Sequence, residues 1–290
     1  MKRLLLGFLI ISLVLAGTGC SKEKEEVITM GFVPMRDGDT LIESVEPLTA
    51  MLSEKLGIKV EGFTATNYVG VVEGLGSGQV DFGFIPPFAY VLANQESDAQ
   101  VILTSLNKSG DAFYRSQFIV RNDSGIESFD DLRGKIVGFV DPSSTSGYLF
   151  PGAHLITQGI DIENDIDYVF SGGHDKSLQL LLNKDVDVAT TFVDVRERYI
   201  DEFPNALEET TILGYTENIP NISVTVSGSM DEDMRIKIQE ALLDIAKSED
   251  GIKLLSDLFN MYGFVESTDA DYEVIRTTAK VMNIDLENQD

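Results

Sequence analysis

Short apolar runs rich in β-branched and aromatic residues alternate with segments of helical periodicity along most of this chain of 290 residues. Such alternation is typical of strand–helix–strand units and of an α/β fold with mainly parallel strands. The predicted strands are VITMGFVP, IKVEGF, VDFGFI, QVILTSL, SQFIVR, KIVGFV, IDYVFS, VDVATTF, TILGYT and ISVTVS. The helices predicted between them cover residues 40–56, 69–75, 88–93, 146–158, 176–183 and 196–202.

The last third of the chain follows a different pattern, with helical periodicity over residues 231–248, 251–261 and 269–282 and no strand predicted between them. So many strands fit two lobes better than one sheet, and continuous strand runs near residues 118 and 219 could cross between the lobes. The expected first lobe is residues 27–117 plus 220–290, closed by the C-terminal helices. The expected second lobe is residues 118–219, and a ligand cleft is expected between the two.

The N-terminus has the layout of an export signal. A Lys-Arg start precedes an apolar run over residues 4–16, which is too short for a membrane-spanning helix, and small residues follow as far as Cys20. The Gly-Cys ending and the polar SKEKEE after it resemble a bacterial lipoprotein signal, although Gly17 replaces the usual aliphatic residue. The resemblance implies a signal peptide at 1–19, lipidation of Cys20 and a tether over 20–26. A plain secretory signal is the alternative.

Composition excludes several classes of function. With 48 acidic against 22 basic residues the formal net charge is -26, which is unsuited to nucleic acid or to an anionic membrane surface. The single Cys allows no internal disulfide, and His154 and His174 add too few ligands for a Cys/His zinc site. No nucleophile elbow, HExxH motif or P-loop is present. Neither an enzyme nor a metal or cofactor is therefore expected.

The stretch DPSSTSGYLFPG, residues 141–152, places consecutive hydroxyl side chains between a predicted strand and a predicted helix. The first turn of a helix has backbone N–H groups without intrahelical partners and a partial positive charge. Ser144, Thr145 and Ser146 could therefore hold an anion without help from Lys or Arg. The simpler alternative is that one hydroxyl caps the helix and the others face water, and capping is the commoner use of Ser and Thr at this place.

Glycines mark the ends of several predicted helices. Gly57 and Gly159 each follow a periodic segment, as C-terminal caps do. The stretch GLGSGQ, residues 74–79, has glycines spaced as in phosphate loops, but it follows a helix and precedes a strand, which is the reverse of a dinucleotide-binding turn. It predicts a helix stop and a turn.

Other polar residues near predicted strand ends have two possible roles each. His174 follows a strand and begins a helix, so it could donate a hydrogen bond to a ligand or could be a solvated loop residue. Asp194 follows another strand, close to Arg196 and Arg198, and could face a ligand or cap a helix. Generic packing is the default for the tyrosines near element junctions, which are Tyr68, Tyr90 and Tyr114.

Taken in order along the chain, several motifs resemble the phosphonate-binding subfamily of ABC-transporter solute-binding proteins. They are LTAMLSEKLGIKVEGFTATNYVGVVEGL, VDFGFIPPFAYVLA, YRSQFIV, FDDLRGKIVGFVDPSSTSGYLFPG, SGGHDKSLQLL, VDVATTFVD and IPNISVTV. The resemblance covers residues 27–265, and STSGYLFPG is its most specific element. It implies a two-lobed type II periplasmic-binding-protein fold with two crossing hinge strands, which closes on its ligand like a clamp.

Carried over by position, the resemblance implies that a set of hydroxyl, imidazole and carboxylate side chains binds the ligand. These are Tyr68, Tyr114, Ser144, Thr145, Ser146, His174 and Asp194, with Tyr90, Asn221 and Ile222 as possible further contacts. Relatives that bind aminoalkylphosphonates have a second acidic residue after the IPN turn, where this chain has Ile222. Asp194 alone could attract an amine, or could accept a hydrogen bond from a protonated P–OH group.

The implied function is that of the extracytoplasmic solute-binding part of an ABC importer for a phosphonate, phosphite or related phosphorus oxyanion. The implied partners are the permease and ATPase subunits, and the chain is expected to be a monomer held at the membrane by a lipid on Cys20. The alternatives are the same fold binding a sulfonate, nitrate or a thiamine-precursor pyrimidine, or a surface lipoprotein that acts as a sensor or binds a protein.

Overall fold

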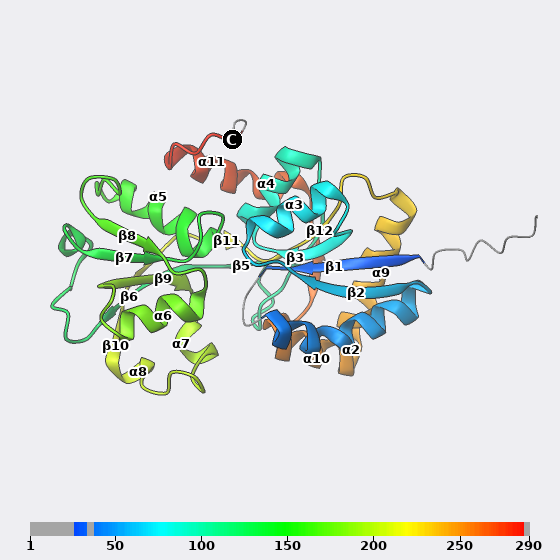
Figure 1. Cartoon of the computed structure of the whole chain (residues 1–290), viewed down its shortest axis with the longest axis horizontal. Helices are drawn as coiled ribbons and strands as arrows, with labels where there is room; N and C mark the ends of the chain where they lie inside the picture. The colour runs from blue at the N-terminus through cyan, green and yellow to red at the C-terminus, as the bar shows by residue number, and fades with distance from the viewer. Residues whose placement is uncertain (1–25, 34–37, 287–290) are drawn as a thin grey trace, which may run out of the picture.

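The computed structural model describes residues 26–33 and 38–286. The chain forms two α/β lobes that lie side by side, one built from the blue, cyan and orange segments of Figure 1 and the other from the green segments. The predicted signal peptide and Cys20 lie outside the described residues. Within the described ranges, no helix has the length and apolar character needed to cross a membrane.

The first lobe contains a sheet of six strands. In sheet order these are β13 (Phe264–Glu266), β4 (Gln100–Ser105), β12 (Ser223–Val226), β3 (Phe82–Ile85), β1 (Val27–Phe32) and β2 (Lys59–Thr64). Every residue of β3 is buried, because helices cover both faces of the sheet at this point.

Helices cover the first lobe on two sides, as Figure 1 shows. The helices α2 (Gly38–Leu56), α9 (Glu232–Lys247) and α10 (Glu249–Phe259) bury their apolar stripes on one face of the sheet. The helices α3 (Val69–Ser77) and α4 (Pro87–Ser97) cover the other face. Gly57 and Gly78 have positive φ angles at the ends of α2 and α3, so both predicted helix stops are confirmed.

The second lobe contains a sheet of five strands. In sheet order these are β10 (Thr210–Tyr215), β6 (Ser116–Arg121), β9 (Val188–Phe192), β7 (Ile136–Phe139) and β8 (Asp167–Phe170). Its helical segments are η1 (Phe129–Leu132), the π-helical turn η2 (Thr145–Leu149), α5 (Phe150–Thr157), α6 (His174–Leu182), α7 (Val195–Arg198) and α8 (Ala206–Glu209). Gly159, just beyond α5, has a φ of 80°, as expected for its predicted role.

The chain passes between the lobes through a pair of short antiparallel strands, β5 (Phe113–Tyr114) and β11 (Ile219–Pro220). The two-lobed fold with two crossing strands is therefore as predicted. The predicted boundary at 117/118 falls inside β6, which begins at Ser116 and pairs with β9 from Ser116 to Val120. The boundary at 219/220 falls within β11.

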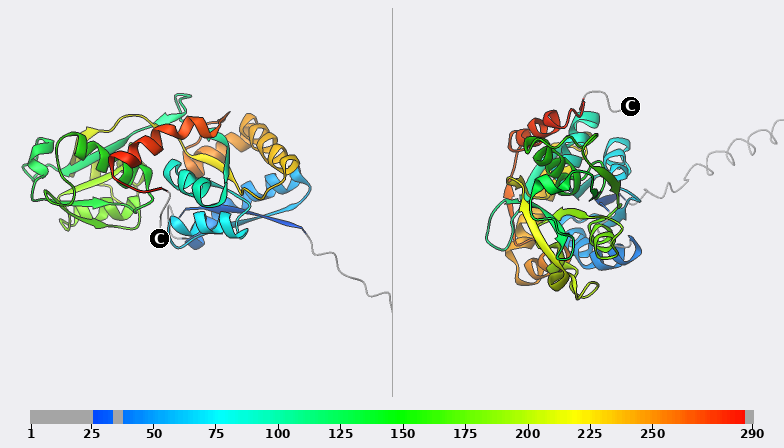
Figure 2. Two further views of the ribbon diagram at one scale, coloured as in Figure 1. Left: turned by 90° about the horizontal axis from the view of Figure 1, so that it is seen from above. Right: turned by 90° about the vertical axis from the view of Figure 1, so that its left-hand side faces the viewer.

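The last helix contacts both lobes, whereas the sequence analysis assigned the C-terminal helices to the first lobe. Helix α11 (Glu273–Val281), which follows the 3₁₀ turn η3 (Asp269–Tyr272), contacts α4 of the first lobe and α5 of the second. Figure 2 shows this red segment lying over the line where the lobes meet. One apolar cluster accordingly runs from Leu75 through Tyr272 and Met282 to Leu155.

Two further sequence predictions were wrong, and one needs refinement. Most strands of each sheet run in the same direction, as predicted, but β12 in the first lobe and β6 in the second run antiparallel to both neighbours. These are the strands that follow the two crossings, so each enters its sheet in the return direction. Strand β13 lies between α10 and α11, where no strand was predicted. The helix predicted over 196–202 is the single turn α7.

Candidate ligand-binding site

A cavity of about 190 Å³ lies between the two lobes. It is lined by every residue predicted as a main ligand contact, namely Tyr68, Tyr114, Ser144, Thr145, Ser146, His174 and Asp194. Asn221 and Ile222, predicted as further contacts, also line it. These residues come from both lobes and from the crossing strands, so the fold brings together side chains that are far apart in the sequence.

The hydroxyl stretch after β7 divides into a turn, a cap and a first helical turn. The Asp141 carboxylate accepts hydrogen bonds from the Ser143 backbone N–H at 2.8 Å and from its hydroxyl at 2.6 Å, and Ser143 does not line the cavity. The Ser144 hydroxyl accepts from the Gly147 N–H at 3.1 Å and is the N-cap. Ser144 is both a helix cap and a cavity residue, so the two readings of this stretch are compatible.

Gly147 is required in this turn for steric reasons. A Cβ atom at this position would lie 2.4 Å from Cβ of Val140, a β-branched residue with little freedom to move. The carbonyl oxygen of Gly147 accepts hydrogen bonds from the Val140 N–H and from the Thr190 hydroxyl, at 3.1 and 2.8 Å. The turn is therefore fixed from two strands, and π-helical turns of this kind occur often at functional sites.

The Thr145 hydroxyl joins the two lobes directly. Its oxygen accepts a hydrogen bond from the backbone N–H of Phe88, in the first turn of α4, at 2.9 Å. Thr145 is fully buried, and Ser144 and Ser146 are nearly so. Because the oxygen of Thr145 already accepts this bond, its own proton remains available for donation into the cavity. The two lobes are therefore in direct contact at this point.

His174 is the first residue of α6 and is 8% exposed. Burial lowers its pKa to about 3, so the imidazole is neutral at pH 7 in the unliganded protein. Its Nδ1 is buried without a hydrogen-bond partner among the described residues, and its ring meets Phe192 edge-on with centroids 4.7 Å apart. An anion placed beside this ring would favour the protonated form and raise the pKa.

Two tyrosines add to the polar lining. Burial raises the pKa of Tyr114, on the crossing strand β5, to about 12, while hydrogen bonds with Ser146 and Thr145 oppose this rise. Tyr68 begins α3 in the first lobe and is 2% exposed. Its pKa is raised by burial and then by Tyr199 of the second lobe. Both phenols are neutral donors at pH 7.

Asp194 stands at the start of α7 with a φ of 66°, in the left-handed region. Its side chain makes no capping hydrogen bond, so the helix-cap alternative does not apply. The residue is exposed at the edge of the cavity. Partial desolvation of its carboxyl, followed by the nearby Glu197, raises its pKa, while Arg196 lowers it. Its position permits contact with a substituent of a bound ligand.

Tyr90, predicted as a possible ligand contact, does not line the cavity, and several residues that do line it were not predicted. Tyr90 is fully buried away from the cavity lining, where its hydroxyl donates to the Asp269 carboxylate at 2.6 Å. Missed lining residues include Arg198, Asn260 and Asn107. Arg198 lies one helical turn after Asp194, and this spacing was the one sequence feature that could have predicted it as a lining residue. Nothing local in the sequence marks Asn260 or Asn107.

Helix starts surround the cavity, which explains how an acidic protein can hold an anion. The residues that line it at or next to a helix start are Tyr68 for α3, Pro86 for α4, Ser144 for η2 and His174 for α6. Each helix start contributes N–H groups and partial positive charge. No group of His, Cys, Asp and Glu in the described part of the chain is arranged to hold a metal ion.

Two α/β lobes, two crossing strands and a polar cavity between them define a solute-binding protein of the hinged, two-lobed class. The family can be stated as well. The chain belongs to the periplasmic phosphonate substrate-binding proteins of ABC transporters, whose family profile matches residues 30–272.

Relatives and solved structures agree with this assignment. The chain is 39% identical over 177 residues to the phosphate-import protein PhnD of Mycolicibacterium smegmatis, a match that covers 58% of this chain and 55%, about half, of that protein. It is 26% identical over 242 residues to the phosphonates-binding periplasmic protein of Escherichia coli, covering 82% and 72% of the two chains. PhnD1 of Prochlorococcus marinus, solved in complex with methylphosphonate, has the same fold, with a TM-score of 0.80, 20% identity and 90% and 100% coverage.

Proposed function

We propose that this chain is the extracytoplasmic solute-binding component of an ABC importer and that it binds a phosphonate or related phosphorus oxyanion between its lobes. The observation that carries the proposal is the cluster of buried hydroxyls at the start of η2, facing an interlobe cavity. Family membership and the names of the relatives support the same ligand class.

The recognition chemistry follows from the donors. The hydroxyl oxygens of Ser144 and Thr145 accept hydrogen bonds from backbone N–H groups. Their own protons are therefore available for hydrogen bonds to the ligand oxygens. Ser146, Tyr114, Tyr68 and His174 add donors around the same tetrahedral group. Each charge-assisted hydrogen bond contributes about 1.5–3 kcal/mol net. Binding makes and breaks no covalent bond, and closure of the lobes is the change that a permease reads.

Asp194 and Ile222 set the choice among phosphorus ligands. A single carboxylate at the cavity edge attracts an amine less strongly than two would, and Ile222 offers an apolar surface to an alkyl group. Asp194 also accepts a hydrogen bond from a ligand P–OH group. The ligand classes that fit are aminoalkylphosphonates, alkylphosphonates, phosphite and phosphate.

The cellular setting follows from the N-terminal sequence. The lipoprotein-like signal supports export, lipidation of Cys20 and attachment to the outer face of the cytoplasmic membrane or to a periplasmic membrane surface. The partners are then the permease and ATPase of the importer, and the binding protein acts as a monomer. Globomycin treatment of producing cells tests the anchor, since a lipoprotein precursor accumulates uncleaved.

Calorimetry and thermal unfolding test the ligand class. The probes are methylphosphonate, 2-aminoethylphosphonate, phosphite and phosphate, with sulfate and taurine as controls of similar size. A ligand present at about 100 times its Kd stabilises the native state by about 2.7 kcal/mol. We expect a response to at least one phosphorus oxyanion and a weaker one to both sulfur compounds. A protein that responds to none of the four phosphorus probes does not have the proposed function.

A further inference from the structure

We propose that Arg198 is a positioning residue that fastens the two lobes in the closed state and thereby slows ligand release. This role adds to the proposed function and rests on it for the ligand measurements. Arg198 belongs to α7 of the second lobe, lines the cavity and is partly buried. Its Nη2 donates to the backbone carbonyl of Leu258, in α10 of the first lobe, at 2.6 Å, and lies 3.4 Å from the carbonyl of Asp257.

The acceptors are well suited to a guanidinium. Leu258 and Asp257 are in the last turn of α10, where carbonyls lack intrahelical partners and the helix carries partial negative charge. The nearby N–H groups of Asn260 and Met261 donate to carbonyls further back in the helix. Arg198 therefore supplies the hydrogen bonds that this helix end lacks, and it does so from the other lobe.

The contact exists only when the lobes are together. The backbone N–H of Arg198 donates to the Asp194 carbonyl at 2.9 Å, so α7 holds the residue within the second lobe. When the lobes separate, the helix end and the guanidinium return to water. A contact made in one of two states shifts the equilibrium toward that state and tightens binding of a ligand that needs it.

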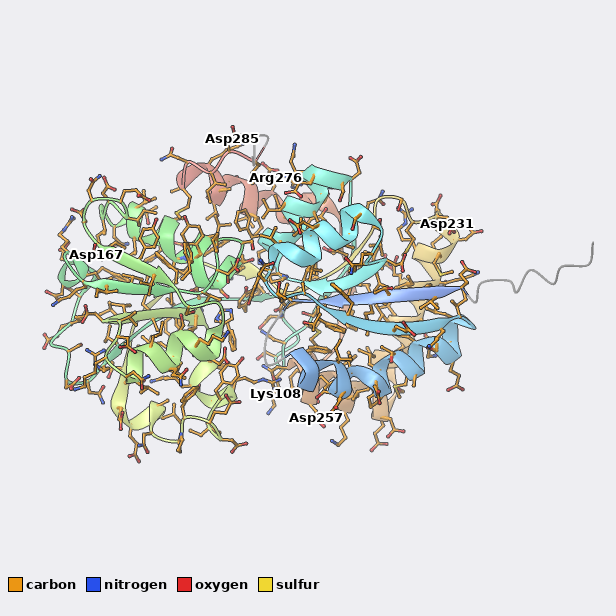
Figure 3. All side chains as sticks on the ribbon, viewed as in Figure 1. Lys108, Asp167, Asp231, Asp257, Arg276 and Asp285 are labelled. Atoms are coloured by element: carbon orange, nitrogen blue, oxygen red, sulfur yellow. The ribbon has the colours of Figure 1, made fainter. Side chains whose placement is uncertain are left out.

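The position of the contact complements the other ties between the lobes. Figure 3 places Arg276 of α11 at the top of the molecule and Asp257 of α10 at the bottom, so the two helices approach the second lobe from opposite sides. Helix α11 contacts both lobes on its side, while Arg198 joins the lobes at the other. Opening at the α10 side therefore requires that the Arg198 contact break.

The test compares Arg198→Gln and Arg198→Lys with two controls on α10. Lys253→Gln removes one positive charge from the same helix. Asp257→Asn removes the carboxylate, which pairs with Lys253 at 2.5 Å, but keeps the carbonyl that Arg198 approaches. With whichever phosphorus probe binds best, stopped-flow displacement gives the dissociation rate and calorimetry gives Kd.

We expect Arg198→Gln to raise the dissociation rate and Kd about tenfold with little change in the association rate, as the loss of a charge-assisted hydrogen bond predicts. Arg198→Lys should recover part of the loss, and both controls should stay within about twofold of the wild type. Equal dissociation rates for wild type and Arg198→Gln would overturn the proposal. An equal effect of Asp257→Asn would instead assign the effect to the carboxylate and also overturn it.

A measurement without ligand separates this proposal from the proposed function. Small-angle scattering of the unliganded proteins should show a larger radius of gyration for Arg198→Gln than for the wild type and Lys253→Gln. A wild type that binds no probe would end the proposed function, while the scattering comparison would still decide the role of Arg198. An unchanged radius of gyration in Arg198→Gln would refute that role.

Discussion

The two sides of the cavity are built in opposite ways. The donor wall, formed by Ser144, Thr145, Ser146 and His174, is buried and lies at helix starts that backbone hydrogen bonds hold in place. The outer rim, formed by Asp194, Arg198 and Asn260, is exposed or partly exposed. Buried donors that are already oriented contribute more free energy per contact than exposed charges, which water screens. The donor wall should therefore determine the affinity for the oxyanion group. The rim should determine which ligand is preferred and how fast the ligand is released.

The largest expected effect is at the donor wall. Thr145→Val keeps the shape of the side chain but removes the donated hydrogen bond and leaves the Phe88 N–H buried without an acceptor. Each loss costs about 1–3 kcal/mol, so calorimetry should show Kd for every phosphorus ligand raised about a hundredfold. Thr145→Ser keeps the hydroxyl and is the control. If valine and serine bound alike, the hydroxyl would have no part in affinity.

The second effect, also at the donor wall, appears with pH. Between pH 6.5 and about 3 the unfolded chain binds a proton at residue 174 that the native unliganded chain does not. Stability should thus fall as the pH is lowered through this range, by up to about 1.4 kcal/mol per pH unit from this group. Urea unfolding at pH 7, 6 and 5 should show His174→Asn losing less stability than the wild type, with a difference of roughly 1–2 kcal/mol by pH 5. Parallel pH profiles would show that His174 is not neutral when buried.

A smaller effect is expected at the rim. Asp194→Asn should weaken 2-aminoethylphosphonate about three- to tenfold, because a partly screened ion pair contributes about 1 kcal/mol. Methylphosphonate has no amine, so its Kd should stay the same or fall slightly. Calorimetry with both ligands on the same preparation gives the ratio. Equal weakening of the two would remove Asp194 as a selector.

The smallest effect is expected at Asn260, which ends α10 with a φ of 56°. Asn260→Gly keeps this left-handed backbone without strain, so unfolding free energy should change by no more than about 0.5 kcal/mol. Affinity should change less than about threefold. A loss as large as that of Thr145→Val would mean that the rim, and not only the donor wall, determines affinity.

Local sequence patterns predicted most of the features that depend on a short segment of the chain. The longer strands, the hydroxyl stretch and the helix stops at Gly57, Gly78 and Gly159 each depend on a short segment, and the structure has them where the sequence placed them. The crossing strands β5 and β11 have two residues each, too few for a periodicity. The predicted crossing near residue 219 coincides with β11, while the one predicted near residue 118 lies a few residues after β5.

The outer rim shows what the sequence left out. Arg198 reaches Leu258, 60 positions further along the chain, and only the closed arrangement of lobes brings them together. The donor wall was easier to predict because Ser144, Thr145 and Ser146 are neighbours in sequence. The split role of the hydroxyl stretch, with Ser143 bound to Asp141 and Ser144 as the cap, also needed atomic geometry.

Helix α11 has a practical consequence for anyone who handles this protein. On the second lobe, Met282 packs against Gly152, where a Cβ atom would lie 2.4 Å from the Met282 methyl group. The Met282 thioether is flexible and can shift against this glycine if the lobes turn. On the first lobe Arg276 binds Asp269 at 2.6 Å and Asn94 at 2.9 Å, which fixes that end. A purification tag or a truncation that reaches α11 therefore acts on a helix that contacts both lobes and can disturb how they sit together.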